Sequence, residues 1–172
     1  YKKLDDKQAI SGSLRYFSLG NIVFTNIFGT PTITVNPNEF AIDAGYSRLF
    51  SDNFSGAMAF RFIRSDLTGG QSVGDYDSKA GISVAADLAF YYTTDIDLGD
   101  KDGTLSFGSN ISNMGRKISY TEDQDAAFIP TNLRLGGNLA IEIDDYNTFA
   151  FSLEFNKLLI PTPPVYDEDS SS

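Results

Sequence analysis

Apolar and polar residues alternate with a period of two along most of the chain. In residues 39–47, for example, Phe40, Ile42, Ala44 and Tyr46 alternate with mainly polar or small residues. Successive side chains of a β-strand point to opposite faces of a sheet, so this pattern predicts strands with one apolar and one polar face. The same period recurs in residues 54–62, 82–92, 104–111, 132–143 and 149–156, and more weakly in residues 14–19. Since no segment has a convincing helical period, the sequence predicts an all-β protein of about seven antiparallel strands.

The lengths of the runs and of their connections favour a membrane barrel. Apart from the weaker run at residues 14–19, the runs span about 8–12 residues, whereas strands of soluble proteins cluster near 5–6 residues and tilted transmembrane strands need roughly 9–11. Tight turns near residues 50–53, 99–103 and 144–147 alternate with long connections. Short periplasmic turns and long extracellular loops are typical of outer-membrane β-barrels. The alternative on the pattern alone is a soluble β-sandwich with one solvated sheet face.

The count of strands predicts that the chain forms part of a larger barrel. We expect long extracellular loops near residues 20–37, 67–80, 114–131 and 158–172. About seven strands would place the two ends of the chain on opposite sides of the membrane, whereas a complete single-chain bacterial barrel has an even number of strands. The prediction for residues 1–172 is therefore roughly half of a barrel. Within the first loop, residues 22–24 and 32–35 could form additional short strands.

Composition excludes several kinds of chemistry. The 172 residues include no Cys, no His and no Trp, which removes disulfides, thiol nucleophiles, most metal sites and Ser-His-Asp catalysis. The net charge of -10 argues against nucleic acid as a partner. The mean hydropathy of -0.18 does not exclude a membrane, because alternating strands average to a polar score. We expect no catalytic residue, no cofactor and no metal.

One acidic cluster raises the question of a calcium site. Asp95, Asp97, Asp100 and Asp102 crowd a single predicted turn, and Asp-x-Asp spacing recurs in calcium-binding loops. However, Ser106 stands where an EF-hand that starts at Asp95 requires its bidentate glutamate. A solvated hairpin turn is the favoured interpretation.

Charged residues within the runs fall on the polar face, which would line the lumen of a barrel. The candidate lumen-facing residues are Arg61, Asp87, Arg134, Glu142 and Glu154. They could contact a cargo or an inserted segment, or they could form ion pairs that fill the interior and fix the strand register. The second interpretation is favoured. Charges on the opposite, lipid-facing side would cost roughly 2–4 kcal/mol each at the bilayer midplane.

Several segments, in order along the chain, resemble the PorV family of outer-membrane proteins of the type IX secretion system of Bacteroidota. These segments are LRYFSLG (14–20), FSDNFSG (50–56), LTGGQS (67–72), FIPTNLRLGG (128–137) and NKLLIPTPP (156–164). The resemblance implies a FadL-like barrel of 14 strands when complete, with an N-terminal hatch that these residues do not include. It also implies a non-enzymatic role in the outer membrane: docking on a SprA-type translocon, receiving the C-terminal domains of secreted cargo, and passing cargo to the attachment complex.

If the resemblance holds, partners would meet the extracellular loops and the outer rim. The candidate contact residues are Phe24, Phe28, Gln71, Tyr76, Phe128 and Tyr166. The FadL-like fold equally allows a second function, a channel for hydrophobic small molecules such as long-chain fatty acids.

Overall fold

The computed structural model describes residues 1–71, 78–121 and 126–160, and all its regular elements are β-strands. They are β1 (Lys2–Lys3), β2 (Gln8–Ser18), β3 (Ile22–Thr25), β4 (Pro31–Val35), β5 (Asn38–Ser51), β6 (Phe54–Asp66), β7 (Gly81–Asp97), β8 (Asp102–Gly115), β9 (Asn132–Asp144) and β10 (Asn147–Leu158). Among these residues, no helix has the length and apolar character needed to traverse a bilayer. The predicted all-β, antiparallel architecture is confirmed.

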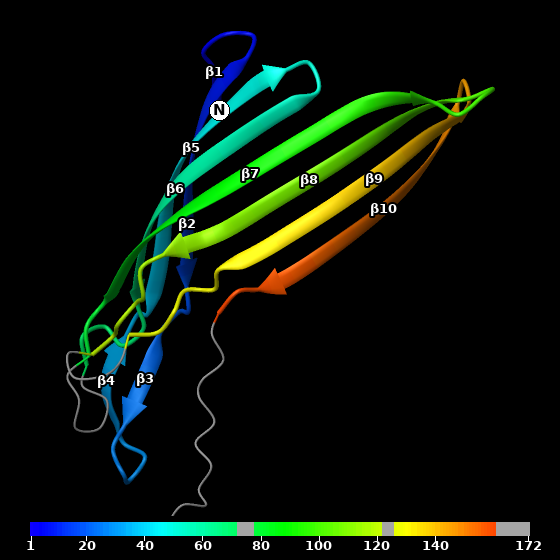
Figure 1. Ribbon diagram of the computed structural model, residues 1–172. Coiled ribbons are helices and arrows are strands. Elements are labelled where there is room, and N and C mark those ends of the chain that lie inside the picture. Colours follow the sequence, from blue (N-terminus) through cyan, green and yellow to red (C-terminus); the bar gives the residue numbers. More distant parts are fainter. Residues whose placement is uncertain (72–77, 122–125, 161–172) are drawn as a thin grey trace, which may run out of the picture.

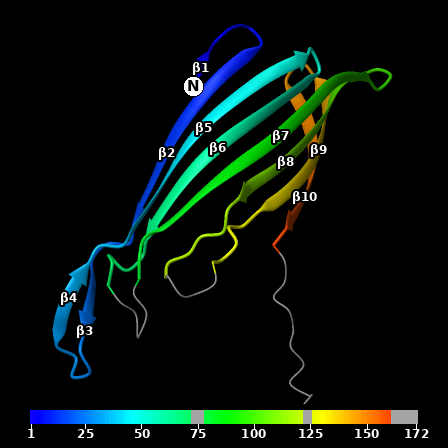
Figure 2. The ribbon, with the colours of Figure 1, turned by 60° about the vertical axis from the view of Figure 1, so that its left-hand side comes forward.

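The described residues form one large sheet and one separate hairpin. The sheet has eight strands in the order β1-β2-β5-β6-β7-β8-β9-β10, and β3 pairs only with β4. Every paired strand is antiparallel to its neighbour. The sheet is curved and open, with β10 at one edge (Figures 1 and 2). This architecture is consistent with part of an outer-membrane β-barrel.

The strand register separates the side chains into two faces. Asp43 stands opposite both Ser13 and Arg61, and we call their side of the sheet the polar face. The apolar face carries large hydrophobic residues on every long strand, and most of them are exposed. They include Leu14, Ile42, Phe60, Val84, Phe107, Leu135 and Leu153. Soluble monomers rarely expose such a continuous apolar surface, whereas a strand wall in contact with lipid requires one.

Tight turns and long connections lie at opposite ends of the sheet. The turns β5–β6, β7–β8 and β9–β10 gather at one end, with the N-terminus, and the long connections gather at the other (Figure 1). We call these the tight-turn end and the loop end.

The long strands extend beyond the runs that the sequence pattern predicts, as β2 and β7 show most clearly. β2 begins at Gln8, although the predicted run begins at residue 14, because small residues at 11–13 weaken the alternation while still pairing with β5. β7 continues to Asp97 because its polar last residues pair with β8 beyond the apolar stretch.

The predicted first loop contains a hairpin, formed by the two segments in which short strands were expected. In the turn between β3 and β4, the Asn26 Oδ1 atom accepts hydrogen bonds from the N–H groups of Phe28 and Thr30, at 2.9 and 3.0 Å. Gly29 has a φ of 77°, which a residue without a Cβ adopts readily. The hairpin projects past the loop end of the sheet (Figure 2).

Candidate functional site

An ion network occupies the polar face across three central strands. The Arg61 guanidinium on β6 lies between two carboxylates: its Nε is 2.5 Å from Asp43 Oδ1 on β5, and its Nη2 is 3.1 Å from Asp87 Oδ2 on β7. These side chains are only 13–19% exposed. Arg15 on β2 extends the network, with Nη2 3.2 Å from Asp43 Oδ2, but its own side chain is 62% exposed. The network therefore joins β2, β5, β6 and β7.

A bulge in β8 connects this network to the chain beyond the strand. Ile111 pairs with Leu88 and Met114 pairs with Ala86, so Ser112 and Asn113 together face Asp87. Asn113 has a φ of 57°, a conformation that Asn tolerates better than most residues.

The side chain and backbone of Asn113 form hydrogen bonds both to the ion network and to the β8–β9 connection. Its N–H donates to Asp87 Oδ1 at 2.7 Å, and its Oδ1 accepts a hydrogen bond from Arg61 Nη1. On the other side, its Nδ2 donates to the Pro130 carbonyl at 3.1 Å, and Thr131 Oγ1 donates to the Asn113 carbonyl at 2.8 Å. Asn113 therefore links the ion network to the β8–β9 connection.

The described parts of the β8–β9 connection, residues 116–121 and 126–131, lie against the polar face. Ile118 and Ile129, 8% and 7% exposed, pack with Ala85 of β7. The Tyr120 hydroxyl donates to Ser65 Oγ of β6 at 3.1 Å. This connection, β2, β5 and β6 together line a cavity of about 520 Å³. Its lining mixes guanidinium, carboxylate and aromatic groups: Arg15, Phe17, Glu39, Arg61, Tyr120 and Phe128.

The five candidate lumen residues share the polar face, but the structure brings only two of them together. Arg61 and Asp87 form an ion pair. Arg134 faces Asn110 and Asn156, Glu142 faces Thr148, and Glu154 faces Gly136. Within the described residues, these last three charged side chains are exposed and have no ion pair or hydrogen bond.

Two residues central to the network were not among the candidates. The sequence pattern does indicate that Asp43 lies on the polar face, because it occupies one of the alternating polar positions of residues 39–47. For Asn113 the sequence gives a weaker indication of an irregularity in the strand: the apolar residues Ile111 and Met114 are three positions apart, which breaks the period of two.

The candidate contact residues at the loop end are mostly exposed. Phe24 lies on β3 and Phe28 lies in the turn of the hairpin, 38% and 84% exposed. Phe128 is 48% exposed, with the Lys117 ammonium 4.3 Å from its ring centre. Gln71 is partly exposed, and its backbone N–H donates to the Thr68 carbonyl at 3.2 Å. Tyr76 and Tyr166 lie outside the described residues.

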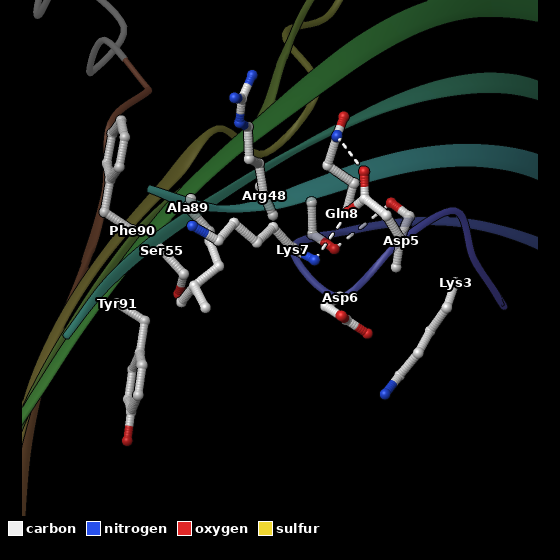
Figure 3. Close-up of a pocket in the computed structure, with 15 residues that line it drawn as sticks. Lys3, Asp5, Asp6, Lys7, Gln8, Arg48, Ser55, Ala89, Phe90 and Tyr91 are labelled. Atoms are coloured by element: carbon white, nitrogen blue, oxygen red, sulfur yellow. Dashed lines mark hydrogen bonds between the residues drawn. The ribbon is translucent and has the colours of Figure 1, made fainter. Parts of the chain in front are cut away.

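At the tight-turn end, a second, open cavity of about 330 Å³ lies beside the β1–β2 turn (Figure 3). Asp5 organises the turn: its Oδ1 accepts from the Lys7 N–H at 2.8 Å and its Oδ2 from Gln8 Nε2 at 2.7 Å. Lys3 and Arg48 also line this cavity. The charged groups that line this cavity are mixed in sign, and one of its two carboxylates, that of Asp5, is engaged in the turn.

The acidic β7–β8 turn uses its carboxylates to hold the turn. Asp97 Oδ1 accepts from the Gly99 N–H at 2.9 Å, and Asp95 Oδ1 accepts from Thr104 Oγ1 at 3.4 Å. In the part of the chain that the structure describes, no group of three or more acidic side chains is positioned to hold a metal ion.

The protein family described as "Type IX secretion system protein PorV" matches residues 1–165. A comparison with curated proteins gives no match.

Proposed function

The chain belongs to the PorV family of type IX secretion system proteins, and from this premise we propose that it acts without catalysis in the bacterial outer membrane. It docks on a SprA-type translocon, receives the C-terminal domains of secreted cargo, and delivers that cargo to the attachment complex. The family match over nearly the whole chain is the observation that carries this proposal.

The apolar face supports the location in the outer membrane. Its exposed side chains, among them Phe60, Phe107 and Leu153 at 63%, 52% and 70% exposed, would be covered by outer-membrane lipid. The charged network lies on the opposite face and would line the lumen, where it avoids the energetic cost of contact with hydrocarbon. The long connections at the loop end would then be extracellular.

The β3–β4 hairpin supports docking of the loop end on a protein partner. Residues 16–38 contain no Asp, Glu, Lys or Arg, although 21% of the chain is charged. In the hairpin, Ile27 and Phe28 are 93% and 84% exposed. An uncharged, apolar element that projects from the sheet gains free energy when a partner covers it, because apolar area then leaves water. We propose that this hairpin contacts the translocon.

Replacing one aromatic residue tests this contact. Phe28→Asp in the full-length protein should reduce co-purification of the translocon from mildly solubilised outer membranes by about tenfold, since a carboxylate in an apolar contact costs at least 1–2 kcal/mol. Tyr146→Asp is the matched control, because Tyr146 is an aromatic turn residue, 95% exposed, at the tight-turn end. Equal recovery of the translocon with both variants would refute the contact.

The cavity on the polar face favours one alternative function, a channel for long-chain fatty acids. Arg15 beside Phe17 and Phe128 could hold a carboxylate head and an apolar tail. Two binding assays on the full-length protein distinguish these functions. Capture of cargo C-terminal domains supports secretion, whereas saturable fatty-acid binding with no capture of translocon or cargo would overturn it.

A further inference from the structure

A glycine interrupts the apolar face where β8, β9 and β10 lie side by side (Figure 1). Gly137 of β9 stands opposite Phe107 of β8 and Leu153 of β10, so its neighbours on both sides carry large side chains. With no side chain at this position, a groove of about 410 Å³ lies over β9. Its walls are formed mainly by apolar side chains, among them Leu105, Phe107, Leu135, Leu139, Leu153 and Phe155.

The geometry of the sheet does not require a glycine at position 137. A Cβ there would meet Phe107 Cδ1 at 3.5 Å, which is an ordinary van der Waals contact, and the backbone has no positive φ. The pairing of β9 with β8 and β10 also continues through this position without a change of register. A glycine inside a strand otherwise marks a bulge, a bend or the close approach of a ligand or another backbone. Because a groove lies directly over Gly137, close approach of a ligand is the reason that fits this surface.

The groove continues along the apolar face. A second hollow of about 320 Å³ shares Phe107 and Leu135 with it and extends to Phe90 of β7. Ser109, another small residue, lies opposite Leu135 and lines this second hollow. A long, narrow, apolar depression fits an extended hydrocarbon chain, because a chain lying in a groove makes more dispersion contacts than one on a flat wall.

A cation lies on the same face, towards the loop end of the groove. Along the described strands β8, β9 and β10, Lys157 is the only charged residue at an apolar-face position, although the chain has 23 acidic and only 13 basic residues. Four residues of β10 separate it from Leu153, which is about 13 Å along a strand. The Lys157 side chain is exposed and has no ion pair within the described residues.

We propose that the groove over Gly137 binds one acyl chain of an anionic phospholipid, whose headgroup phosphate pairs with the Lys157 ammonium. This inference rests on the membrane location proposed above. A lysine on a lipid-facing wall costs little free energy near the bilayer interface, and its stem can lie along apolar surface while the ammonium reaches the headgroups. A basic residue at that depth attracts anionic headgroups. The bound lipid gives this side of the wall a specific lipid neighbour.

Native mass spectrometry of the full-length protein tests the headgroup contact, with equal amounts of phosphatidylglycerol and phosphatidylcholine added in mild detergent. The unmodified protein should retain phosphatidylglycerol in preference to phosphatidylcholine. Lys157→Gln should reduce this preference about fivefold, because the anionic headgroup loses its cation. Arg134→Gln is the matched control, since it removes a cation from the neighbouring strand on the polar face, and it should leave the preference unchanged. No preference in the unmodified protein, or equal effects of the two variants, overturns the proposal.

A pair of glycine variants tests the groove. Gly137→Val should lower the retention of phosphatidylglycerol about threefold, because its side chain occupies the place of the acyl chain. Gly136→Val is the control on the polar face, where an added Cβ would meet nothing closer than 3.6 Å, and it should retain the lipid. Heat-modifiable migration checks that each variant is folded, and Gly137→Ala takes the place of Gly137→Val if the latter does not fold.

Three outcomes of this second test contradict the proposal. Unchanged lipid retention by the folded Gly137 variant shows that the groove holds no acyl chain. Loss of the translocon without loss of lipid assigns the groove to the wall of a protein partner instead. An unmodified protein that does not insert into lipid vesicles refutes the membrane location and the lipid site together, whereas inserted protein without lipid preference refutes the lipid site alone.

Discussion

At the residue scale, Arg61 is the shielded cation at the centre of the ion network on the polar face. Its guanidinium compensates both Asp43 and Asp87, and the three side chains are largely shielded from water. Removing one partner of such a shielded network leaves uncompensated charge, which costs more than the loss of an exposed ion pair. Arg134 lies on the same face but is exposed and has no side-chain partner among the described residues.

The contrast between these two arginines gives a stability prediction. Arg61→Gln should lower the free energy of unfolding of the full-length protein in lipid vesicles by about 3 kcal/mol, because Asp43 and Asp87 lose their shared cation. Arg134→Gln should change it by less than about 0.5 kcal/mol, as for ordinary surface substitutions. Urea titration followed by tyrosine fluorescence measures both. Similar losses for the two variants would show that the network has no special role in stability.

Sequence reasoning reaches this network only partly. The period of two places Asp43, Arg61 and Asp87 at polar positions of their strands. Which residues face each other depends on the register, and a slip of one residue would exchange the faces. The role of Asn113 depends on a bulge, which adds a residue to one strand and interrupts the alternation. Pairing of this kind is a property of the folded sheet.

At the element scale, β7 shows how far the alternation determines a strand. Between Ile82 and Tyr92 its even positions are apolar, and the structure places them on one face. The ends of strands are less predictable, because polar residues such as Thr93 can extend a strand through backbone pairing alone. The sequence pattern does not decide whether the first loop contains a hairpin for the same reason: short uncharged segments fit either a strand or a loop.

Two neighbouring positions of β7 test which face meets the membrane. Leu88→Arg places a charge on the apolar face and should destabilise the folded barrel by about 2–4 kcal/mol if that residue lies near the bilayer midplane. Ala89→Arg places the same charge on the polar face, where water is accessible, and should cost much less. Folding yield into lipid vesicles, read from heat-modifiable migration, compares the two. Greater damage from Ala89→Arg would mean that the faces are reversed.

At the scale of the whole molecule, the open edges of the sheet need hydrogen-bonding partners if the sheet lies in a membrane. β10 pairs with β9 on one side only, and β2 pairs with β1 through two residues only, in the part of the chain that the structure describes. Unpaired backbone groups are costly in hydrocarbon, so a membrane sheet has to close. We propose that further strands complete the wall. The sequence pattern predicts strands suited to a membrane sheet, but it does not determine the number of strands in a closed barrel.

The same scale relates the two ends of the molecule to function. The loop end combines the uncharged hairpin, the described parts of the β8–β9 connection and the aromatic candidates Phe24, Phe28 and Phe128. The tight-turn end presents charged turns such as Asp5–Lys7. This asymmetry is what a protein needs if it meets its partners on one side of the outer membrane only.

Site-specific photo-crosslinking in living cells tests whether the hairpin at the loop end meets the translocon. A photoreactive phenylalanine analogue is placed either at Phe28, in the hairpin at the loop end, or at Tyr146, in the β9–β10 turn at the tight-turn end. We expect a covalent adduct with the SprA-type translocon from position 28 and none from position 146. Absence of a translocon adduct at position 28, or equal adducts at both positions, would contradict it.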